Sequence, residues 1–357
     1  MIHAIIMAGG AGTRFWPASR RHRPKQFLDL ADGRPLLRAT FERVAPIVPA
    51  DRIWVVSGQR TTEATRSLLA ELPAENVLGE PSGRDTAACA GYAAHVVLSR
   101  DPEGVCVVLP ADHLIGDEER LRSALATGAR HVESQGGLLT FGVRPTRPET
   151  GYGYLKLGEP HSQIEGWRIH RLDGFVEKPD LATARTYAAS DGYLWNSGMF
   201  AWRARDLLEE IRRQLPLLAD GLQLIADALG HPSEASTLHD LYPRLPRTSI
   251  DFGVMEGARR RWTIPVDFTW SDVGSWPALA ELLACDADGN VAQGRVLPID
   301  ALDNVLISEG PVVAAVDVEG VIVIATKDAV LVLPAASGQR VKEVVSRLEE
   351  LGWDDVL

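Results

Sequence analysis

The sequence predicts an α/β fold built on a mostly parallel sheet, followed by a smaller β-rich domain. Three observations predict this fold. Up to Val143, apolar strand-like runs alternate with segments whose apolar residues have the spacing of a helix. The pattern changes at Gly151, and short β runs follow Asn290. Continuous apolar strands that alternate with helices are typical of parallel sheets with right-handed crossovers. We therefore predict a larger domain over residues 1–285 and a small domain over residues 286–357 that ends in a helix.

In the first half, each predicted strand is a short apolar run that ends at turn residues. The strands are Ile2–Ala8, Ile53–Ser57, Asn76–Gly79, Val105–Pro110 and Gly137–Val143. The segments between them carry apolar residues at the spacing of amphipathic helices, and these are Leu36–Val44, Thr61–Leu72, Thr86–Arg100 and Glu118–Ser134. Asp85 directly precedes the third of these helices, where we expect its carboxylate to cap the free backbone N–H groups.

The second half has a different pattern. From Gly151 to Trp202 short strands predict an antiparallel insertion, and Leu207–Leu229 has the spacing of a helix that Pro216 breaks. The C-terminal elements are the β runs Val305–Ser308, Val312–Val316, Val321–Ala325 and Val330–Pro334, and the amphipathic helix Val341–Leu351. Turn residues separate the β runs, which favours a β-meander or a short β-helix.

The composition is that of a globular protein and excludes several classes. The chain has 357 residues, 45% of them hydrophobic, and a formal net charge of −11, whereas nucleic-acid-binding proteins usually present a broad basic surface. No apolar stretch reaches the ~20 residues that cross a membrane. The scattered Cys89, Cys106 and Cys285 form no zinc motif. We predict a cytoplasmic protein that binds neither nucleic acid nor membranes, and whose apolar tail strands could supply a homodimer interface.

A glycine-rich turn follows the first strand, and basic side chains follow the turn. The residues are Gly9, Gly10, Gly12, Thr13, Arg14 and Lys25. Glycines let backbone N–H groups approach phosphate oxygens, and Arg and Lys side chains neutralise those oxygens. The turn is neither a P-loop, which requires Gly-Lys where Thr13-Arg14 stands, nor a complete dinucleotide fingerprint. A tight turn beside a solvated charged face would give the same residues, but in an acidic protein we favour a phosphate-rich ligand.

Two aspartates are candidate ligands of Mg²⁺. Asp112 comes directly after the strand Val105–Pro110, and Asp272 lies in a turn between Trp270 and Trp276. Mg²⁺ prefers one or two carboxylates together with phosphate oxygens and water. An isolated Asp more commonly caps a turn, so the hypothesis requires that these two aspartates converge on one ion.

Two further loops combine carboxylates with hydrogen-bond donors. Residues 80–86 lie between a strand and a helix and offer Glu80 and Asp85 as acceptors for the N–H donors of guanine. Glu177 and Lys178 follow a strand, where a Lys can neutralise an anion and a carboxylate can accept from sugar hydroxyls. Each loop alone is more simply a helix cap or an exposed ion pair. Together with the glycine turn they indicate transfer at phosphorus, where catalysis is mainly positioning and charge neutralisation.

Seven ordered blocks resemble the sugar-1-phosphate nucleotidyltransferase family, in the variants of mannose-1-phosphate guanylyltransferases (GDP-mannose pyrophosphorylases). The blocks are Ala8–Pro17 with Arg23–Phe27, Gly83–Ala87, Leu109–His113, Thr150–Tyr154, Phe175–Pro179, Trp195–Phe200 and Trp270–Trp276. The resemblance implies a Rossmann-like nucleotidyltransferase domain with a left-handed β-helix-like tail. It also implies transfer of GMP from GTP to α-D-mannose 1-phosphate, with release of diphosphate and with Mg²⁺ as cofactor.

The resemblance implies roles for individual residues. Arg14, Lys25, Asp112 and Asp272 would be catalytic, with the two aspartates as metal ligands. The nucleotide-binding residues would be Gly9, Gly10, Gly12, Thr13, Glu80, Gly83, Arg84, Asp85 and Thr86. The residues that bind the sugar phosphate would be Gly151, Glu177, Lys178, Asn196 and Gly198. The attacking phosphate oxygen is already anionic near neutral pH, so we expect an in-line displacement that needs no general base.

Two features depart from the family pattern. Asp85 stands where relatives commonly carry Asn, so the choice of base stays open, and the chain stops near the end of the β-rich tail, so we expect no phosphomannose isomerase activity. Three alternatives stay open as well. The chain could use another pair of sugar phosphate and nucleoside triphosphate, it could be a non-catalytic subunit that binds sugar nucleotides, or, least favoured, it could be a nicotinamide-dependent dehydrogenase.

Overall fold

The computed structural model describes residues 1–10, 12–30 and 33–357, and its contacts divide the chain into two compact units. Unit 1 comprises Met1–Gly9, Thr40–Ala111 and Ile115–Trp270, and unit 2 comprises Gly10–Ala39, Asp112–Leu114 and Ser271–Leu357. Ala11 of the glycine turn lies outside the described residues. Each unit therefore combines stretches that are far apart in the sequence. The division into domains at residue 285 follows chain order and stays a prediction.

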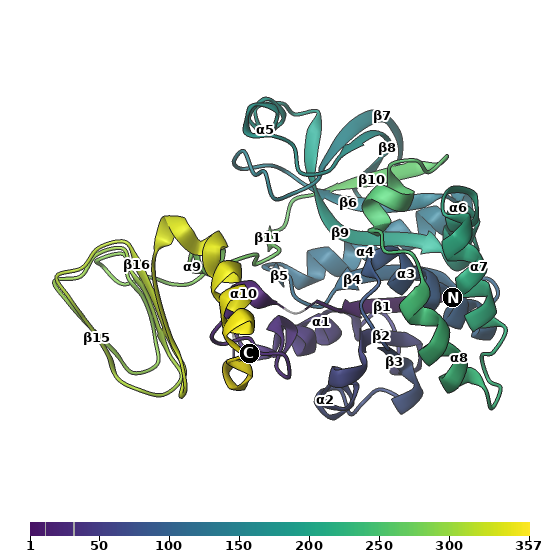
Figure 1. The fold of residues 1–357 in the computed structure, drawn as a ribbon. Helices are drawn as coiled ribbons and strands as arrows, with labels where there is room; N and C mark the ends of the chain where they lie inside the picture. The colour runs from purple at the N-terminus through teal and green to yellow at the C-terminus, as the bar shows by residue number, and fades with distance from the viewer. Residues whose placement is uncertain (11, 31–32) are drawn as a thin grey trace. The chain divides into compact units, whose positions relative to one another are not determined.

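Unit 1 is built on a nine-stranded sheet with the order β3-β2-β1-β4-β9-β6-β10-β8-β7 (Figure 1). Its first four strands are all parallel and comprise β1 (Ile2–Ala8), β2 (Ile53–Gly58), β3 (Val77–Glu80) and β4 (Val105–Pro110). β6 (Leu138–Val143) and β10 (Arg261–Val266) pair in parallel further along the sheet. These strands confirm the predicted Rossmann-like, mostly parallel arrangement, and their bounds differ from the predicted ones by about one residue.

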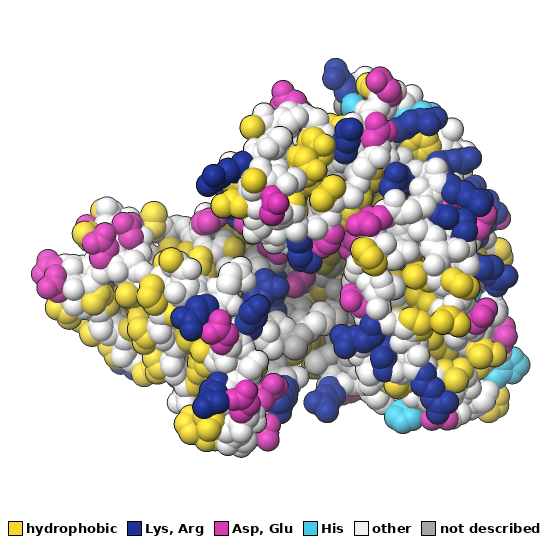
Figure 2. All heavy atoms as spheres, turned by 45° about the horizontal axis from the view of Figure 1, so that its top comes forward, with side chains coloured by type: hydrophobic (Ala, Val, Ile, Leu, Met, Phe, Trp, Pro, Cys, Tyr) yellow, Lys and Arg dark blue, Asp and Glu magenta, His cyan; other side chains and the backbone are white. Residues whose placement is uncertain are grey.

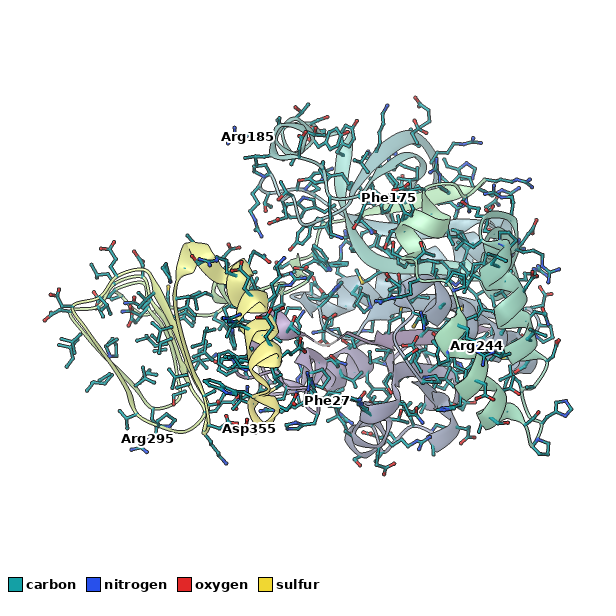
Figure 3. The ribbon with its side chains drawn as sticks, in the orientation of Figure 1. Phe27, Phe175, Arg185, Arg244, Arg295 and Asp355 are labelled. Atoms are coloured by element: carbon teal, nitrogen blue, oxygen red, sulfur yellow. The ribbon has the colours of Figure 1, made fainter. Side chains whose placement is uncertain are left out.

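Three long strands run antiparallel within the same sheet. β9 (Tyr193–Arg203) lies between β4 and β6, and β7 (Tyr154–Ile164) pairs with β8 (Trp167–Val176) at the far edge. Phe175, which Figure 3 labels, lies near the end of β8. The antiparallel segment predicted after Gly151 is therefore part of the main sheet rather than an insertion beside it, because β9 lies between two of its strands.

Helices cover both faces of this sheet. One face carries α3 (Asp85–Arg100), α6 (Ala204–Gln214) and α7 (Pro216–Ala226). Their shared core includes Trp54 and Leu138. α4 (Glu118–Gln135) packs on the opposite face, where Gly128 approaches Leu139, because successive side chains of a strand point to opposite sides. The remaining helices of unit 1 are α2 (Thr62–Leu68), α5 (Leu181–Ala188), α8 (Glu234–Leu241) and the π-helix Asp251–Met255.

Two helix predictions need correction. α2 ends at Leu68 rather than Leu72, because Leu69 leaves the helical conformation ahead of Pro73. Asp85 does not cap α3, because it is the first residue of the helix, with φ of +66°, and its carboxylate accepts from the adjacent N–H of Thr86 at 2.9 Å. The break predicted at Pro216 is confirmed, since α6 ends at Gln214 and Pro216 begins α7.

Unit 2 contains the β-rich tail, whose strands belong to two sheets. One sheet comprises the parallel β12 (Val291–Gln293), β14 (Val305–Ser308) and β16 (Val321–Ala325), with β17 (Val330–Pro334) antiparallel at its edge. The other pairs β13 (Val296–Ile299) with β15 (Val313–Val316) in parallel. The chain alternates between the two sheets, as in a β-helix. β12 and β13 were not among the predicted strands.

One core joins the glycine-turn segment of unit 2 to its C-terminal part. The ring centroid of Phe15 lies 4.9 Å from that of Trp276, in α9 (Trp276–Ala280), whose indole N–H donates to the carbonyl of Trp16 at 3.2 Å. The indole N–H of Trp16 donates in turn to the carbonyl of Val356 at 2.8 Å. α10 (Val341–Leu351) adds Val345 to the same core.

Three short elements lie where the chain passes from one unit to the other. They are α1 (Leu36–Val44), β5 (Leu114–Ile115) and β11 (Trp270–Ser271). None of the helices in the described part of the chain combines the length and apolar character that a membrane crossing requires.

Candidate active site

The glycine turn of unit 2 is fixed against Lys25. Gly12 has φ of +60°, a conformation that favours glycine, and its carbonyl accepts from the Ser19 hydroxyl at 2.8 Å. A Cβ on Gly12 would lie 2.6 Å from the Cβ of Lys25. Gly10, with φ of +99°, precedes this contact, and Thr13 follows it as the first residue of a 3-10 turn. A glycine at position 12 is therefore what allows the turn to touch the lysine segment.

Lys25 connects the two candidate metal ligands. Its side chain is buried, with 6% of its surface exposed. The ammonium donates to the Asp112 Oδ2 at 2.9 Å and to the backbone carbonyl of Asp272 at 2.5 Å. Its nitrogen also lies 5.6 Å from the ring centroid of Phe15. Two aspartates that are far apart in the sequence thus lie against one ammonium group within unit 2.

Asp112 is held in its ionised form. Burial by itself would raise the pKa of this carboxyl, but the charges of Lys25 and His113 and the hydrogen bond from Lys25 keep the pKa below its ordinary value. A carboxylate must be deprotonated to bind a metal ion. Asp112 therefore has the protonation state at neutral pH that a metal ligand requires.

Arg14 and Asp272 border the same glycine. The guanidinium of Arg14 donates to the carbonyl of Gly274 at 2.9 Å. A Cβ on Gly274 would lie 3.1 Å from Asp272 Oδ2 and 3.2 Å from Arg14 Nη1. The structure thus brings all four predicted catalytic residues into unit 2, around Lys25 and Gly274.

The donor set around Lys25 suits Mg²⁺. In the described residues, no group of three or more His, Cys, Asp or Glu side chains could hold a metal ion by itself. Mg²⁺ typically takes one or two protein carboxylates and completes its shell with phosphate oxygens and water. Asp112 and Asp272 fit that requirement, with Asp112 ionised and Asp272 held beside it through Lys25.

The predicted base-binding loop of unit 1 starts at a buried acid. Glu80 ends β3, and its Oε1 accepts a hydrogen bond from the hydroxyl of Tyr242. Burial raises the pKa of Glu80 to about 7, although the hydrogen bond from Tyr242 lowers it. Gly9 lies beside this carboxylate, since a Cβ there would be 3.7 Å from Glu80 Oε2. Burial therefore moves the titration of Glu80 toward neutral pH.

The same loop holds two polar atoms without protein partners. Within the described residues, Ser82 Oγ and Arg84 Nε are buried and make no hydrogen bond. Such atoms are uncommon in folded proteins. Gly83 and Asp85 are exposed next to them, and the hydroxyl of Thr86 accepts from the N–H of Ile250 at 2.8 Å. The loop therefore has hydrogen-bonding capacity that the described protein atoms do not use.

Asn196 is the centre of the predicted sugar-binding group in unit 1. Its Oδ1 accepts from the hydroxyl of Thr140 at 3.1 Å and from the N–H of Gly198 at 3.2 Å. Its Nδ2 donates to Asp251 Oδ1 at 2.7 Å. Both ends of the amide therefore have defined partners.

Glu177 lies next to Asn196 through Gly153. A Cβ on Gly153 would be 2.5 Å from Glu177 Oε2 and 3.4 Å from the Cβ of Asn196, and the N–H of Asn196 donates to the carbonyl of Gly153 at 2.8 Å. Lys178 donates to Glu177 Oε1 at 2.7 Å. Gly151 instead donates to the side chain of Glu149. Gly153 rather than Gly151 is the glycine that packs on these residues.

Asp251 and Tyr242 were not among the predicted site residues. Burial, and then the negative charge of Glu177, raise the pKa of Asp251 to about 6, although the hydrogen bond from Asn196 lowers it. Asp251 begins a π-helix, a rare element that is frequent at functional sites. The sequence contains only a lone Asp before an apolar segment, which is a common helix start. No local signal links it to Asn196.

Comparisons with known proteins decide the family. A family model described as Nucleotidyl transferase matches residues 3–289. The chain belongs to the nucleotidyl transferase family. A second model, described as the MannoseP isomerase/GMP-like beta-helix domain, matches residues 294–348 and agrees with the mostly parallel strand pairs of the tail. Both the predicted enzyme class and the predicted fold class are confirmed.

Relatives cover almost the whole nucleotidyltransferase chain. The xanthan biosynthesis protein XanB of Xanthomonas campestris is 40% identical across 98% of this chain and 73% of its own length. The mannose-1-phosphate guanylyltransferase of Escherichia coli is 36% identical across 98% of this chain and 74% of its own. A crystal structure described as a mannose-1-phosphate geranyltransferase from Thermus thermophilus has a TM-score of 0.86 at 40% identity, and covers 98% of this chain and 99% of that one.

Proposed function

We propose that this nucleotidyltransferase transfers GMP from GTP to α-D-mannose 1-phosphate and releases diphosphate. The carrying observation is that the buried Lys25 contacts both Asp112 and Asp272. A buried cation that holds one aspartate by its carboxylate and the other by its backbone carbonyl suits phosphoryl chemistry, in which positioning and charge neutralisation supply most of the catalysis. The choice of mannose and guanine is supported by the E. coli relative, which is named mannose-1-phosphate guanylyltransferase.

The triphosphate is proposed to lie on unit 2. Backbone N–H groups of Gly10, Gly12 and Thr13 would approach its oxygens, and Arg14 and Lys25 would neutralise the charge that moves to the leaving diphosphate. The nucleophile is a phosphate oxygen of the sugar phosphate, which forms a bond to the α-phosphorus while the bond to diphosphate breaks. Because that oxygen is already anionic, no side chain has to remove a proton.

Asp112 and Asp272 are proposed to hold Mg²⁺. When bound, the ion would stabilise the negative charge of the phosphate groups. Lys25 keeps Asp112 ionised and holds the turn of Asp272 beside it. The lysine thereby orients both ligands in addition to its contact with phosphate.

The base is proposed to lie on the loop of unit 1 that runs from Glu80 to Thr86. Glu80 and Asp85 offer carboxylate acceptors to the N–H donors of guanine, and Gly9, Gly83 and Thr86 border the same loop. The buried Ser82 Oγ and Arg84 Nε support this assignment, since a ligand would give them the partners that they lack among the described residues. Asp85 can only accept when ionised, which suits a donor edge.

The sugar phosphate is proposed to lie on Gly151, Glu177, Lys178, Asn196 and Gly198. Glu177 would accept from sugar hydroxyls, Asn196 would hydrogen-bond a sugar hydroxyl, and Lys178 would neutralise the phosphate. The contacts that group Glu177, Asn196 and Gly198 support this assignment. The side chain of Lys178 is mostly exposed, as a residue that meets a soluble anion needs to be.

The decisive test measures diphosphate release by the purified chain with Mg²⁺, across GTP, ATP, UTP and dTTP and across mannose and glucose 1-phosphate. We expect the highest kcat/KM for GTP with mannose 1-phosphate. Lys25→Met should reduce kcat by about 10²–10³-fold, the usual cost of removing a preorganised charge. Lys342→Met removes an exposed charge from α10 of the same unit and should leave kcat unchanged.

Three results would contradict the proposal. A preference for another substrate pair would assign the chain to a different nucleotidyltransferase. No diphosphate release with any pair would favour the non-catalytic subunit. Near-normal turnover by folded Lys25→Met would remove the lysine from the mechanism.

We also propose a cytoplasmic homodimer, without nucleic acid or membrane as partner. Most of the exposed large hydrophobic side chains of the described residues belong to the C-terminal tail, where they gather on its surface (Figure 2). They include Leu297, Val316 and Val332. Exposed apolar side chains that recur over several strands can serve as an interaction surface. A cytoplasmic site of action agrees with the supply of nucleoside triphosphate there.

A further inference from the structure

We propose that Asp251 is a positioning residue of the sugar pocket, and that it fixes the amide of Asn196 so that this amide presents a donor to the sugar. The inference rests on the proposed function and assigns a role to a residue outside the predicted site. The fixed orientation of the amide makes the pocket specific for a hydroxyl that accepts from Asn196 and donates to Glu177.

Among the described residues, the hydrogen bonds of Asn196 leave one hydrogen of its Nδ2 without an acceptor. An amide oxygen accepts two hydrogen bonds, and an amide nitrogen donates two. Two donors lie at Asn196 Oδ1, the N–H of Gly198 at 3.2 Å and the hydroxyl of Thr140 at 3.1 Å, and the single proton of that hydroxyl is shared with the carbonyl of Met199 at 3.2 Å. One hydrogen of Nδ2 goes to Asp251 Oδ1 at 2.7 Å. The second hydrogen is what Asn196 can offer to a ligand.

Asp251 and Gly198 together set this orientation. The N–H of Gly198 can only donate, and an ionised carboxylate can only accept. If the Asn196 amide turned over, its nitrogen would face the N–H of Gly198 and its oxygen would face Asp251. Thr140 does not decide the matter, because a hydroxyl can donate or accept. Asp251 is therefore the side chain that excludes the turned-over orientation of the Asn196 amide.

The backbone holds Asp251 in place. The carbonyl of Asp251 accepts from the N–H of Glu256 at 3.0 Å, the i to i+5 bond of the π-helix. The preceding residue, Ile250, donates to the Thr86 hydroxyl at 2.8 Å, and the carbonyl of Thr248 accepts from Ala87 at 3.2 Å. These bonds attach the segment to the start of α3, so Asp251 does not depend on the ligand for its position.

Glu177 complements the donor of Asn196. Gly153 packs against the Glu177 carboxylate and the Cβ of Asn196, so the carboxylate lies beside the Asn196 side chain. A donor and an acceptor side by side suit one sugar hydroxyl, since a hydroxyl can accept and donate at once. Burial is the main cause of the raised pKa of Asp251, which is about 6, and the negative charge of Glu177 adds to it. That contribution agrees with the two carboxylates being neighbours.

The test compares Asp251→Ala with Asp251→Asn in the full chain. The alanine variant loses the acceptor, and the asparagine variant keeps one in its side-chain oxygen. We expect Asp251→Ala to raise the KM for the sugar phosphate about tenfold, the cost of one hydrogen bond, with the KM for GTP unchanged. Asp251→Asn should stay within about threefold of the wild type. Glu256→Gln is the matched control, because it removes a neighbouring carboxylate whose pKa is also raised by burial and by Glu177, and it should change neither KM.

Deoxy analogues distinguish positioning from a general structural effect. The analogues are mannose 1-phosphates that lack the 2-, 3- or 4-hydroxyl. In the wild type, one of these analogues should raise KM more than the other two. In Asp251→Ala, removal of that same hydroxyl should raise KM no more than removal of the others. Three results would overturn the inference. They are an unchanged KM for the sugar phosphate in Asp251→Ala, an equal rise in the KM of the wild type with all three analogues, and a tenfold rise in KM in Asp251→Asn. The asparagine variant alone decides it if the alanine variant does not fold. An inactive wild type would instead refute the proposed function.

Discussion

At the scale of single residues, Glu80 shows how burial changes a carboxyl group. Its folded pKa of about 7 lies above the ordinary value of 4.5, so between these pH values the folded protein binds more protons than the unfolded chain. The stability contributed by protonated Glu80 is therefore complete below about pH 4.5 and is lost as the pH rises to about 7. A shift of this size corresponds to on the order of 3 kcal/mol.

Replacing Glu80 with Gln should remove this pH dependence. We expect the free energy of unfolding of the wild type to fall between pH 5 and pH 7 relative to that of Glu80→Gln, as measured by urea unfolding at both pH values. Glu75→Gln, at an exposed position shortly before the same strand, should behave as the wild type. The same change in the free energy of unfolding between pH 5 and pH 7 for wild type and Glu80→Gln would show that the carboxyl group is not held in its protonated form.

The four residues that were predicted to be catalytic come from local motifs, and the structure places all four of them in unit 2. The two aspartates were expected to converge, and both contact Lys25 in the structure. Asp251 and Tyr242 were missed because their roles depend on partners far away in the chain, Asn196 and Glu80. A lone Asp or Tyr carries no local pattern that names such a partner.

At the scale of elements, the β-helix tail is held together by two buried asparagines. The amide nitrogen of Asn304 donates to Asn290 Oδ1 at 2.9 Å and to the carbonyl of Val318 at 3.0 Å, and its oxygen accepts from the N–H of Val321 at 2.9 Å. Asn304 thus bonds backbone groups in successive turns of the tail: the N–H of Val321 uses its side-chain oxygen as acceptor, whereas the carbonyl of Val318 also accepts from the N–H of Leu302 at 3.0 Å. Buried polar groups without partners are costly.

Asn304→Ala should therefore destabilise the tail. We expect the free energy of unfolding to fall by about 1–3 kcal/mol, because the N–H of Val321 loses the side-chain oxygen that accepts its hydrogen bond. Urea unfolding measures this loss. Glu319→Gln, an exposed substitution in the same domain, serves as the control and should unfold as the wild type does. A stability equal to that of the wild type would mean that the asparagine ladder contributes little.

Element prediction worked best where the hydrophobic pattern was long or continuous. The strands β1 and β4 and the helix α10 have the predicted bounds, because each buries a regular set of apolar side chains. β12 and β13 escaped prediction because they have three and four residues and bury few of them, too short a pattern to recognise. The parallel pairing of the tail strands depends on which turns stack, and the sequence does not show that.

At the scale of the whole molecule, the apolar surface of the tail bears on assembly. β17 is the edge strand of its sheet, and Val330 and Val332 on it are mostly exposed. An exposed apolar edge strand is a ready partner for another strand. We therefore expect light scattering with size-exclusion chromatography to show a dimer for the wild type and a monomer for Val332→Lys.

Leu217→Lys tests whether any exposed leucine would have this effect. Leu217 on α7 is 76% exposed but belongs to unit 1, so its substitution should leave the dimer intact. Dissociation by both substitutions, or by neither, would place the interface elsewhere or show that the chain is a monomer.

The class of fold, the order of the elements and the kind of chemistry could all be inferred from the amino-acid sequence. Hydrophobic periodicity and glycine-rich turns act over a few residues, so they can be read locally. Which distant residues share a site became clear only from the folded chain, since the unit that holds Lys25 is assembled from residues 10–39, 112–114 and 271–357. The protonation of Glu80 and the orientation of the Asn196 amide also required the fold, because burial and hydrogen-bond partners exist only after distant segments have packed together.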